Sequence, residues 1–257
     1  MSTLRTRRPG EFCWINMLTP EPEQARGFFG SLLGWTYSDM PGMGHLIQVG
    51  GRPIGGLFDL NGPNTPPGTP AHIGVMVKVE SADAIAAKVT ALGGTARAPF
   101  DIGASGRMAV CHDPNGAPFD IWEPRKNAGT DVDGTLHGAP CWFETMTTDA
   151  ARAATFYEQL FGWTSSSAPM PWGVPYTTFK LGSEAVAGMM PIMPGMGAMP
   201  AHWAVYVTVA DTDVCAREAV ALGATVFLPA QEIPGTGRFC GIRSPQGVAF
   251  SVIAHAR

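Results

Sequence analysis

The 257-residue chain contains one sequence pattern twice, and this repeat constrains the fold more than any other feature. The segment CWINMLTPEPEQARGFFGSLLGW, from Cys13, aligns without a gap on CWFETMTTDAARAATFYEQLFGW, from Cys141. A second pair of matching segments begins at Pro70 and Pro200, and a third pair ends in the turn sequences DPNG and SPQG. Self-similarity at a nearly constant offset indicates duplicated structural units.

We therefore predict two homologous modules, residues 10–124 and 138–254, joined by a polar linker at residues 125–137. Each module has two halves with the same order of elements: a strand, an amphipathic helix, and two or three further strands. In EPEQARGFFGSLLGW the apolar residues recur at helical spacing, and Gly34 is placed to end the helix. Ser81 is a good N-cap for the next helix. The pattern predicts an α+β fold made of four βαβββ units.

Composition excludes several classes of partner. The formal charge is −4 and no long basic run is present, which argues against nucleic acid. No stretch approaches the roughly 18 apolar residues that a membrane-spanning helix needs, and the basic head MSTLRTRRPG is not followed by an apolar segment. The five cysteines form no C-x-x-C pair, so reduced thiols are expected. We expect a cytoplasmic protein whose partner is a small molecule.

The repeated segments resemble the vicinal oxygen chelate superfamily, which includes glyoxalase I, extradiol ring-cleaving dioxygenases and bleomycin-binding proteins. The similarity rests on the strands that lead into FFGSLLGW and FYEQLFGW, and on the DPNG and SPQG turns before the last strands. Within the superfamily, the chain is most similar to duplicated, glyoxalase-like actinobacterial proteins, among them a mycobacterial antigen and proteins labelled hydroxylases. The resemblance implies two glyoxalase-like modules with curved mixed sheets, each around a cleft.

The resemblance also implies where a metal ion would be held. It assigns three cleft-facing ligand positions in each module: Trp14, Gly74 and Asp120 in the first, and Trp142, Ala204 and Ser251 in the second. Only Asp120 among them is a typical metal ligand, so the usual triad of two histidines and a carboxylate is missing. We expect no cofactor, and a divalent metal only if its ligands have moved, for example to Glu144 and His202.

Cleft-facing residues that differ between the copies are the best candidates for function. Glu144 stands where the first module has Asn16, and an apolar cleft would raise its pKa enough for acid or base catalysis. We predict Glu144 as the catalytic group, with His202 and Tyr206 assisting through hydrogen bonds. The competing interpretations are a solvated or ion-paired Glu144, a core Tyr206, and a His202 that only hydrogen-bonds at the start of its strand.

The predicted substrate-binding residues come from both modules and from the methionine-rich segment GMMPIMPGMGAMP. That segment, with PMPWG from Pro169, predicts contact with an aromatic or polycyclic ligand, although a lid or packing role would also fit. The tryptophans could instead pack against the partner module, and Asp120 could pair with Lys78. The predicted binding residues are Trp14, Asn16, His72, Met76, Asp120, Trp122, Trp142, Met190 and Met193.

Two other charged positions have structural interpretations. The repeated Arg107 and Arg238 are expected to close loops by hydrogen bonds rather than to grip an anionic substrate. Glu123 lies one step out of the cleft-facing alternation, at the end of its strand, and we predict that it faces solvent.

The leading hypothesis is an enzyme that acts on a hydrophobic, oxygenated, aromatic secondary metabolite by acid/base chemistry, without the usual metal triad. One alternative is a non-catalytic binding or sequestering protein of the bleomycin-resistance kind. Another is a metal-dependent dioxygenase or lyase with relocated ligands. Because both modules lie in one chain, a monomer could complete its own clefts, and a homodimer is the other arrangement left open.

Overall fold

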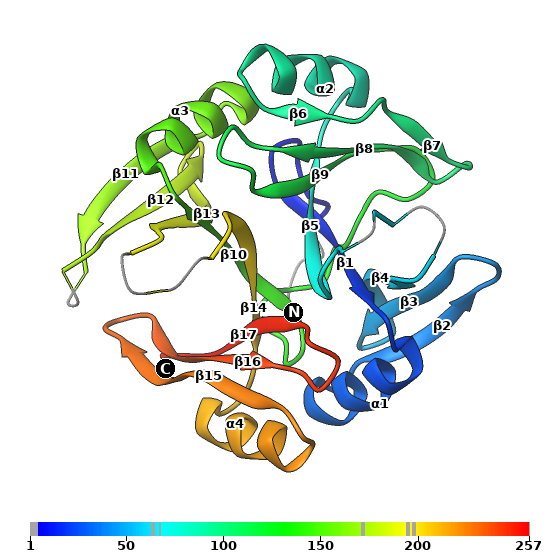
Figure 1. The fold of residues 1–257 in the computed structure, drawn as a ribbon, viewed down its shortest axis with the longest axis vertical. Coiled ribbons are helices and arrows are strands. Elements are labelled where there is room, and N and C mark those ends of the chain that lie inside the picture. Colours follow the sequence, from blue (N-terminus) through cyan, green and yellow to red (C-terminus); the bar gives the residue numbers. More distant parts are fainter. Residues whose placement is uncertain are drawn as a thin grey trace.

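The computed structural model shows two curled, mixed β-sheets that pack against each other, with helices at their two junctions (Figure 1). It describes residues 5–62, 65–66, 68–170, 173–193, 196 and 199–256.

The first sheet has nine strands, in the order β2-β3-β4-β1-β5-β9-β8-β6, with β7 also paired to β8. It is mixed, because β1 runs parallel to β4 and antiparallel to β5. Its elements are β1 (Phe12–Thr19), α1 (Pro22–Leu33), β2 (Thr36–Met40), β3 (Gly44–Val49), β4 (Arg52–Asp59), β5 (His72–Lys78), α2 (Ala82–Ala91), β6 (Thr95–Ala96), β7 (Phe100–Ile102), β8 (Gly106–His112) and β9 (Pro118–Pro124).

The second sheet has eight strands and the equivalent order, β11-β12-β13-β10-β14-β17-β16-β15. Its elements are β10 (Pro140–Thr147), α3 (Ala150–Phe161), β11 (Thr164–Pro169), β12 (Pro175–Leu181), β13 (Glu184–Pro191), β14 (His202–Thr208), α4 (Thr212–Ala221), β15 (Thr225–Ile233), β16 (Gly237–Arg243) and β17 (Ala249–His255).

This arrangement confirms the predicted α+β fold, with a strand-helix-strands unit four times and a curved mixed sheet from each pair of units. One detail differs: the second unit has an additional short strand, because β6 and β7 pair separately with β8. The predicted helix ends are confirmed. Gly34 takes the left-handed conformation after α1, and the Ser81 side chain accepts a hydrogen bond of 3.3 Å from the Ala84 N–H at the start of α2.

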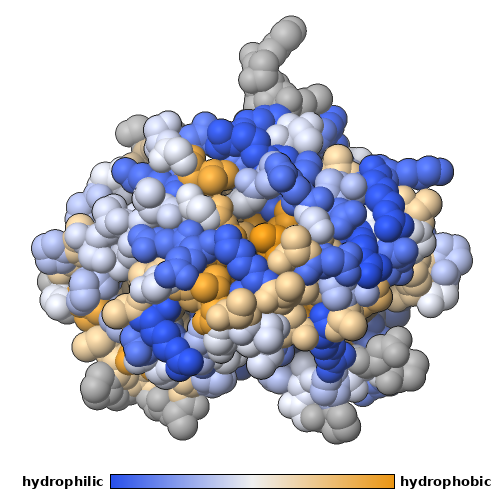
Figure 2. Space-filling model, turned by 90° about the horizontal axis from the view of Figure 1, so that it is seen from above, coloured by the Kyte–Doolittle hydropathy of each residue, from blue (hydrophilic) through white to orange (hydrophobic). Residues whose placement is uncertain are grey.

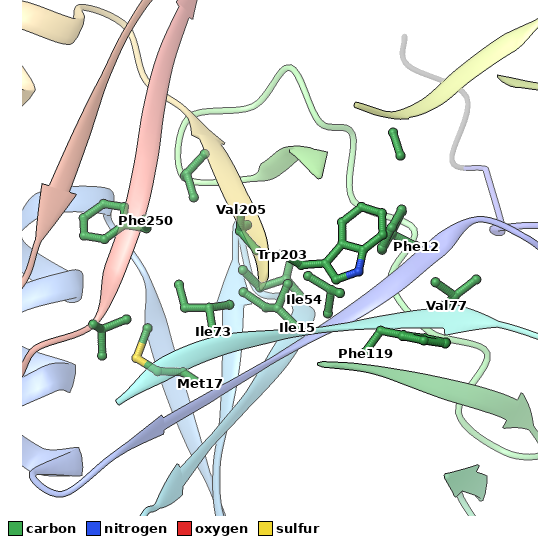
Figure 3. Packing of buried hydrophobic residues seen from close by; sticks show 14 of the residues in the cluster. Phe12, Ile15, Met17, Ile54, Ile73, Val77, Phe119, Trp203, Val205 and Phe250 are labelled. Atoms are coloured by element: carbon green, nitrogen blue, oxygen red, sulfur yellow. The ribbon is translucent and has the colours of Figure 1, made fainter. Parts of the chain in front are cut away.

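A shared hydrophobic core fills the space between the two sheets (Figure 3). Phe12 on β1 stacks on Phe143 of β10, with ring centroids 4.1 Å apart. Phe119 of β9 meets Tyr157 of α3 edge to face. Because residues from both halves of the chain bury one another, the modules stabilise each other and turn their other sheet faces outward (Figure 1).

Two equivalent tryptophan hydrogen bonds tie each module to the other. Trp35, after α1, donates from Nε1 to the carbonyl of Gly138 at 2.7 Å, and Trp163, after α3, donates to the carbonyl of Gly10 at 2.9 Å. Both glycines lie just before the first strand of the opposite module and have positive φ angles. The repeated Leu-x-Gly-Trp segments are therefore part of the contact between modules.

The DPNG turn forms as predicted and makes an additional contact between modules. Asp113 Oδ1 accepts hydrogen bonds from the backbone N–H groups of Asn115 and Ala117, at 2.8 and 2.9 Å. Its Oδ2 accepts one from the Tyr157 hydroxyl at 3.0 Å, which in turn accepts one from Trp203 Nε1. All three side chains are buried, so every polar atom of this network depends on its partner.

None of the described helices combines the length and the apolar character needed to cross a lipid bilayer.

Candidate functional site

The predicted site residues lie on two separate surfaces. We call the side of the first sheet that is turned away from the shared core face 1, and the equivalent side of the second sheet face 2. Cys13, Met76 and Trp122 form one hydrophobic cluster on face 1. Tyr206, Phe239 and Ile253 form another on face 2. The sheets curl so that these faces are concave and open in opposite directions (Figure 1).

A register shift in the first strand of each module places the candidates on these faces. In β10 the shift lies between Pro140 and Trp142, and after it Phe143 points to the core side while Trp142 and Glu144 point to face 2. Glu144 lies opposite Gly188 of β13 and Ala204 of β14. These two neighbours are small, so they leave space beside the carboxyl group for larger side chains from other strands.

Glu144 is buried, with 5% of its surface exposed, and is bonded to two phenols. The hydroxyl of Tyr206 donates to Glu144 Oε1 at 3.1 Å, and Tyr176 of β12 also hydrogen-bonds to this carboxyl group. Trp142 Nε1 donates to the Tyr176 hydroxyl at 2.7 Å. Because an indole N–H can only donate, the hydrogen of the Tyr176 hydroxyl is available for Glu144.

Burial raises the pKa of Glu144 above that of an ordinary glutamate, and the two phenol hydrogen bonds oppose this in part. Burial also raises the pKa of both tyrosines, and the nearby Glu144 carboxyl adds to the effect, so both phenols stay protonated. The alternative of a solvated or ion-paired Glu144 is wrong, because this carboxyl is buried and its hydrogen-bond partners are uncharged.

Gly188 is required for this arrangement. A Cβ atom at this position would lie 1.8 Å from the Tyr176 hydroxyl oxygen and 2.9 Å from Trp142 Nε1. Any side chain here would displace the phenol from its place between Trp142 and the Glu144 carboxyl.

His202 lies further along face 2, at the start of β14 and opposite Met146. Its Nδ1 is 2.9 Å from the carbonyl oxygen of Pro200, so this nitrogen carries the proton and Nε2 is an acceptor. The prediction that His202 assists Glu144 stays a prediction. The competing interpretation was that His202 only forms a hydrogen bond at the start of its strand, and this bond, to Pro200, is present. His72 makes the equivalent bond to the carbonyl of Pro70 at 2.8 Å.

Methionines border the His202 end of face 2. Met190 of β13 pairs with Met146 of β10 and is half-buried. Met193 follows β13 and is 38% exposed. Parts of the two segments that were predicted to contact the ligand lie outside the described residues. These parts are 194–195 and 197–198 of the methionine-rich segment, and 171–172 of PMPWG.

Face 1 has a different set of polar groups. Asn16 Nδ2 donates to Asp120 Oδ2 at 3.1 Å, and burial raises the pKa of Asp120 to about 7. The suggested pairing of Asp120 with Lys78 is wrong: the described ion pairs do not include it, Lys78 has no effect on the pKa of Asp120, and Lys78 Nζ donates to the carbonyl of Ala128 at 3.2 Å. The linker carbonyl lies within reach of the lysine.

Aromatic and sulfur-containing side chains surround this pair. Met76 pairs with Trp14 on one side and with Asp120 on the other. Trp122 is buried and donates from Nε1 to the carbonyl of Asn127 at 2.9 Å. Trp14 packs against this cluster, away from the shared core, so the suggestion that it packs against the partner module is wrong.

The repeated arginines have the structural role that was expected. Arg107 bonds to Asp83 and Asp101, and Arg238 bonds to Asp213. Each ties a strand to the first turn of a helix. Glu123 is half-buried rather than fully solvent-facing: its carboxylate accepts a hydrogen bond of 2.9 Å from the N–H of Ala82, one of the backbone donors at the start of α2.

Two residues of face 2 were missed by the sequence analysis. Tyr176 bonds to Glu144, and Met146 lies between His202 and Met190. Strand alternation carried the signal for Tyr176, because the buried Phe179 in PYTTFKL points to the core, and the residue three positions away therefore faces outward.

Two cavities in the described part of the chain are lined by residues other than Glu144. One of about 380 Å³ lies where α2 and α3 meet and is lined by Leu92, Arg152 and Phe156, among others. The surface on the side of α2 and α3 has small hydrophobic areas surrounded by hydrophilic residues (Figure 2). A smaller cavity of about 140 Å³ is lined by Arg5, Arg7 and Trp142, among others.

The ligand positions that the superfamily resemblance assigns do not suit a divalent metal. On face 2 they carry Trp142, Ala204 and Ser251, and the phenols that hold Glu144 are neutral donors rather than metal ligands. Among the described residues, no group of three or more His, Cys, Asp or Glu side chains could hold a metal ion. The suggested pair of Glu144 and His202 shares a face but not a register position.

Comparison with known proteins agrees with the duplicated fold. A glyoxalase-like domain matches the chain twice, over residues 14–122 and 142–253. CFP32 of Mycobacterium tuberculosis, provisionally described as a glyoxylase, is 35% identical over 256 residues, which cover 97% of this chain and 96% of the relative. The anthracycline biosynthesis protein DnrV of Streptomyces peucetius is 31% identical, covering 95% of this chain and 93% of the relative.

Solved structures share the fold at low sequence identity. The Mn(II)-bound glyoxalase from Novosphingobium aromaticivorans has a TM-score of 0.66 and 14% identity, over 96% of this chain and 82% of that one. Homoprotocatechuate 2,3-dioxygenase from Brevibacterium fuscum has a TM-score of 0.66 and 12% identity, over 100% and 83% of the two chains. Two matched domains that together span most of the sequence, with relatives along its whole length, show that this chain belongs to the glyoxalase-like family.

Proposed function

We propose that this protein is a metal-independent enzyme of secondary metabolism that transfers a proton on an oxygenated aromatic substrate, with Glu144 on face 2 as the acid/base. The observation that carries the proposal is the buried Glu144 carboxyl, held by two neutral phenols among aromatic side chains. A carboxyl group with a raised pKa accepts and returns a proton more readily near neutral pH than an ordinary one.

The lining of face 2 supports an aromatic substrate. Trp142, Tyr206 and Phe239 offer ring surfaces around the carboxyl, and Met146 and Met190 offer adaptable apolar contacts at the other end. The relative DnrV is described as an anthracycline biosynthesis protein, which favours a polycyclic aromatic metabolite for this chain as well.

The reaction that fits these groups is an isomerisation by proton transfer. Glu144, as the carboxylate, takes a proton from a carbon atom next to a carbonyl group, and the electron pair moves onto the carbonyl oxygen. As Glu144 becomes protonated, the hydroxyl hydrogen of Tyr206 or Tyr176 turns from the Glu144 carboxyl to that oxygen and stabilises its negative charge. The protonated Glu144 then returns the proton to another carbon of the conjugated system, so no oxidant or second reactant is consumed.

The test is deuterium exchange from solvent. Chelator-treated protein is incubated in D2O with a panel of anthracycline aglycones, and mass spectrometry follows deuterium incorporation at the carbon atoms of the conjugated ketone system. Because general base catalysis contributes roughly 10²–10⁴-fold, we expect Glu144→Gln to slow the exchange by at least about 100-fold. Asp120→Asn, on the opposite face, is the matched control and should exchange at the wild-type rate.

Three results would overturn the proposal. Glu144→Gln could keep wild-type exchange, or exchange could require an added divalent metal. An aglycone could also bind tightly and be recovered without exchange, which would favour the binding and sequestering alternative.

A further inference from the structure

Face 1 holds a half-buried carboxyl group, that of Asp120, which the proposed reaction does not use. Asp120 keeps some accessible surface on face 1, and the described residues include no ion pair to it. Its hydrogen-bond partner there is the neutral amide of Asn16. A carboxylate that is partly removed from water without a cation beside it is costly, because its lost hydration is not replaced.

The charged and titratable groups on the surrounding strands are engaged elsewhere. On β5, Lys78 donates to the carbonyl of Ala128. On β8, Arg107 is bound by Asp83 and Asp101, and the Cys111 thiol is kept neutral because burial, with a contribution from Asp120, raises its pKa to about 12.

Three groups of face 1 present acceptors. The Asn16 amide directs its Nδ2 to Asp120, which leaves Oδ1 as the free end. His72 donates from Nδ1 to the Pro70 carbonyl, which leaves Nε2 as an acceptor. Asn16 and His72 are neighbours, since a Cβ atom on Gly74 would lie 3.9 Å from Asn16 Cβ and 3.8 Å from His72 Nε2. The third acceptor is the Asp120 carboxylate.

Acceptors beside an aromatic wall match one chemical group in particular. A protonated primary amine has three donors and no acceptor, and its charge is attracted both to a carboxylate and to the face of an indole ring. Trp14 is half-buried beside Met76 and supplies such a ring. Face 2 differs, because its tyrosines donate and Ser251 replaces the Asp120 carboxylate.

We propose that face 1 is a second binding site, specific for a hydrophobic ligand with a protonated amine, whose ammonium group pairs with Asp120 and also donates to Asn16 and His72. The site is separate from Glu144 and does not depend on the proposed reaction. A hydrophobic body attached to the amine would cover Trp14, Met76 and Trp122.

The test compares two probes that differ only in the charged group. Binding of 2-(2-naphthyl)ethylamine and of 2-(2-naphthyl)ethanol is measured by calorimetry with the full chain at pH 8, above the pKa of about 7 that burial gives Asp120. We expect the amine to bind at least 10-fold more tightly than the alcohol. Asp120→Asn should remove this preference, and so should Asp120→Ser, which installs the residue that face 2 has at this position.

The matched control is Glu144→Gln, which should keep the preference for the amine while it loses deuterium exchange. This separates a failure of the amine site from a failure of the proposed function. The proposal is wrong if both probes bind equally, if neither binds at millimolar concentration, or if folded Asp120 variants keep the preference.

Discussion

Replacing Asp120 by Asn should change how the stability of the protein depends on pH. Burial raises the pKa of Asp120 to about 7, whereas an aspartate in an unfolded chain titrates near 3.9. Between these values the folded chain keeps a proton that the unfolded chain has lost, so the free energy of unfolding falls as the pH rises. One pKa unit corresponds to about 1.4 kcal/mol, so Asp120 removes up to about 4 kcal/mol of stability by pH 7.

The measurement is urea denaturation of wild type and Asp120→Asn at several pH values from 4 to 8. The variant does not titrate at this position, so its stability relative to wild type should increase by up to about 4 kcal/mol across this range. Asp83→Asn is the control: Arg107 holds the pKa of the exposed Asp83 below its ordinary value, so Asp83 titrates below this pH range and the stability difference from wild type should stay nearly constant between pH 5 and 8. A stability difference between Asp120→Asn and wild type that is constant with pH would refute the raised pKa of Asp120.

Two further substitutions test the contact between modules and the geometry of face 2. Tyr157→Phe leaves the buried Asp113 carboxylate without its hydroxyl donor, and should lower the free energy of unfolding by roughly 2–4 kcal/mol in urea denaturation; a loss under 0.5 kcal/mol would contradict this. Gly188→Ala should displace Tyr176 and slow deuterium exchange at least about 10-fold in a protein that remains folded by circular dichroism. Wild-type exchange in that variant would show that Tyr176 does not position the carboxyl group.

The sequence was a good guide to the fold because the fold repeats. Two copies of one pattern, each with helical periodicity and a terminal glycine such as Gly34, were enough to predict the strand-helix-strands units, and the superfamily resemblance implied their assembly into two curved mixed sheets. The sequence could not show that β6 and β7 are separate strands, because segments of two or three residues are too short to display an alternation of apolar and polar residues.

Strand alternation was enough to predict which sheet face each site residue lies on. It could not predict which side chains from different strands contact each other. Alternation placed Glu144 and Tyr206 on one face, and the structure joins them by a hydrogen bond. Tyr176 was missed because its contact with Glu144 depends on the register of β12 and on the space left by Gly188. The pairing of Asp120 with Lys78 was predicted wrongly, because Lys78 donates instead to the carbonyl of Ala128. That carbonyl lies in the linker and is distant from Lys78 in sequence.

The central claim is that Glu144 performs acid/base chemistry without a metal ion, and the rate of deuterium exchange against pH in chelator-treated protein tests it most directly. A general base must be deprotonated, so the account predicts that the exchange rate falls as the pH falls through the raised pKa of Glu144, above the range of an ordinary glutamate. The same profile should be absent in Glu144→Gln. Exchange that appears only after a divalent metal is added, or a profile that Glu144→Gln leaves unchanged, would contradict the account.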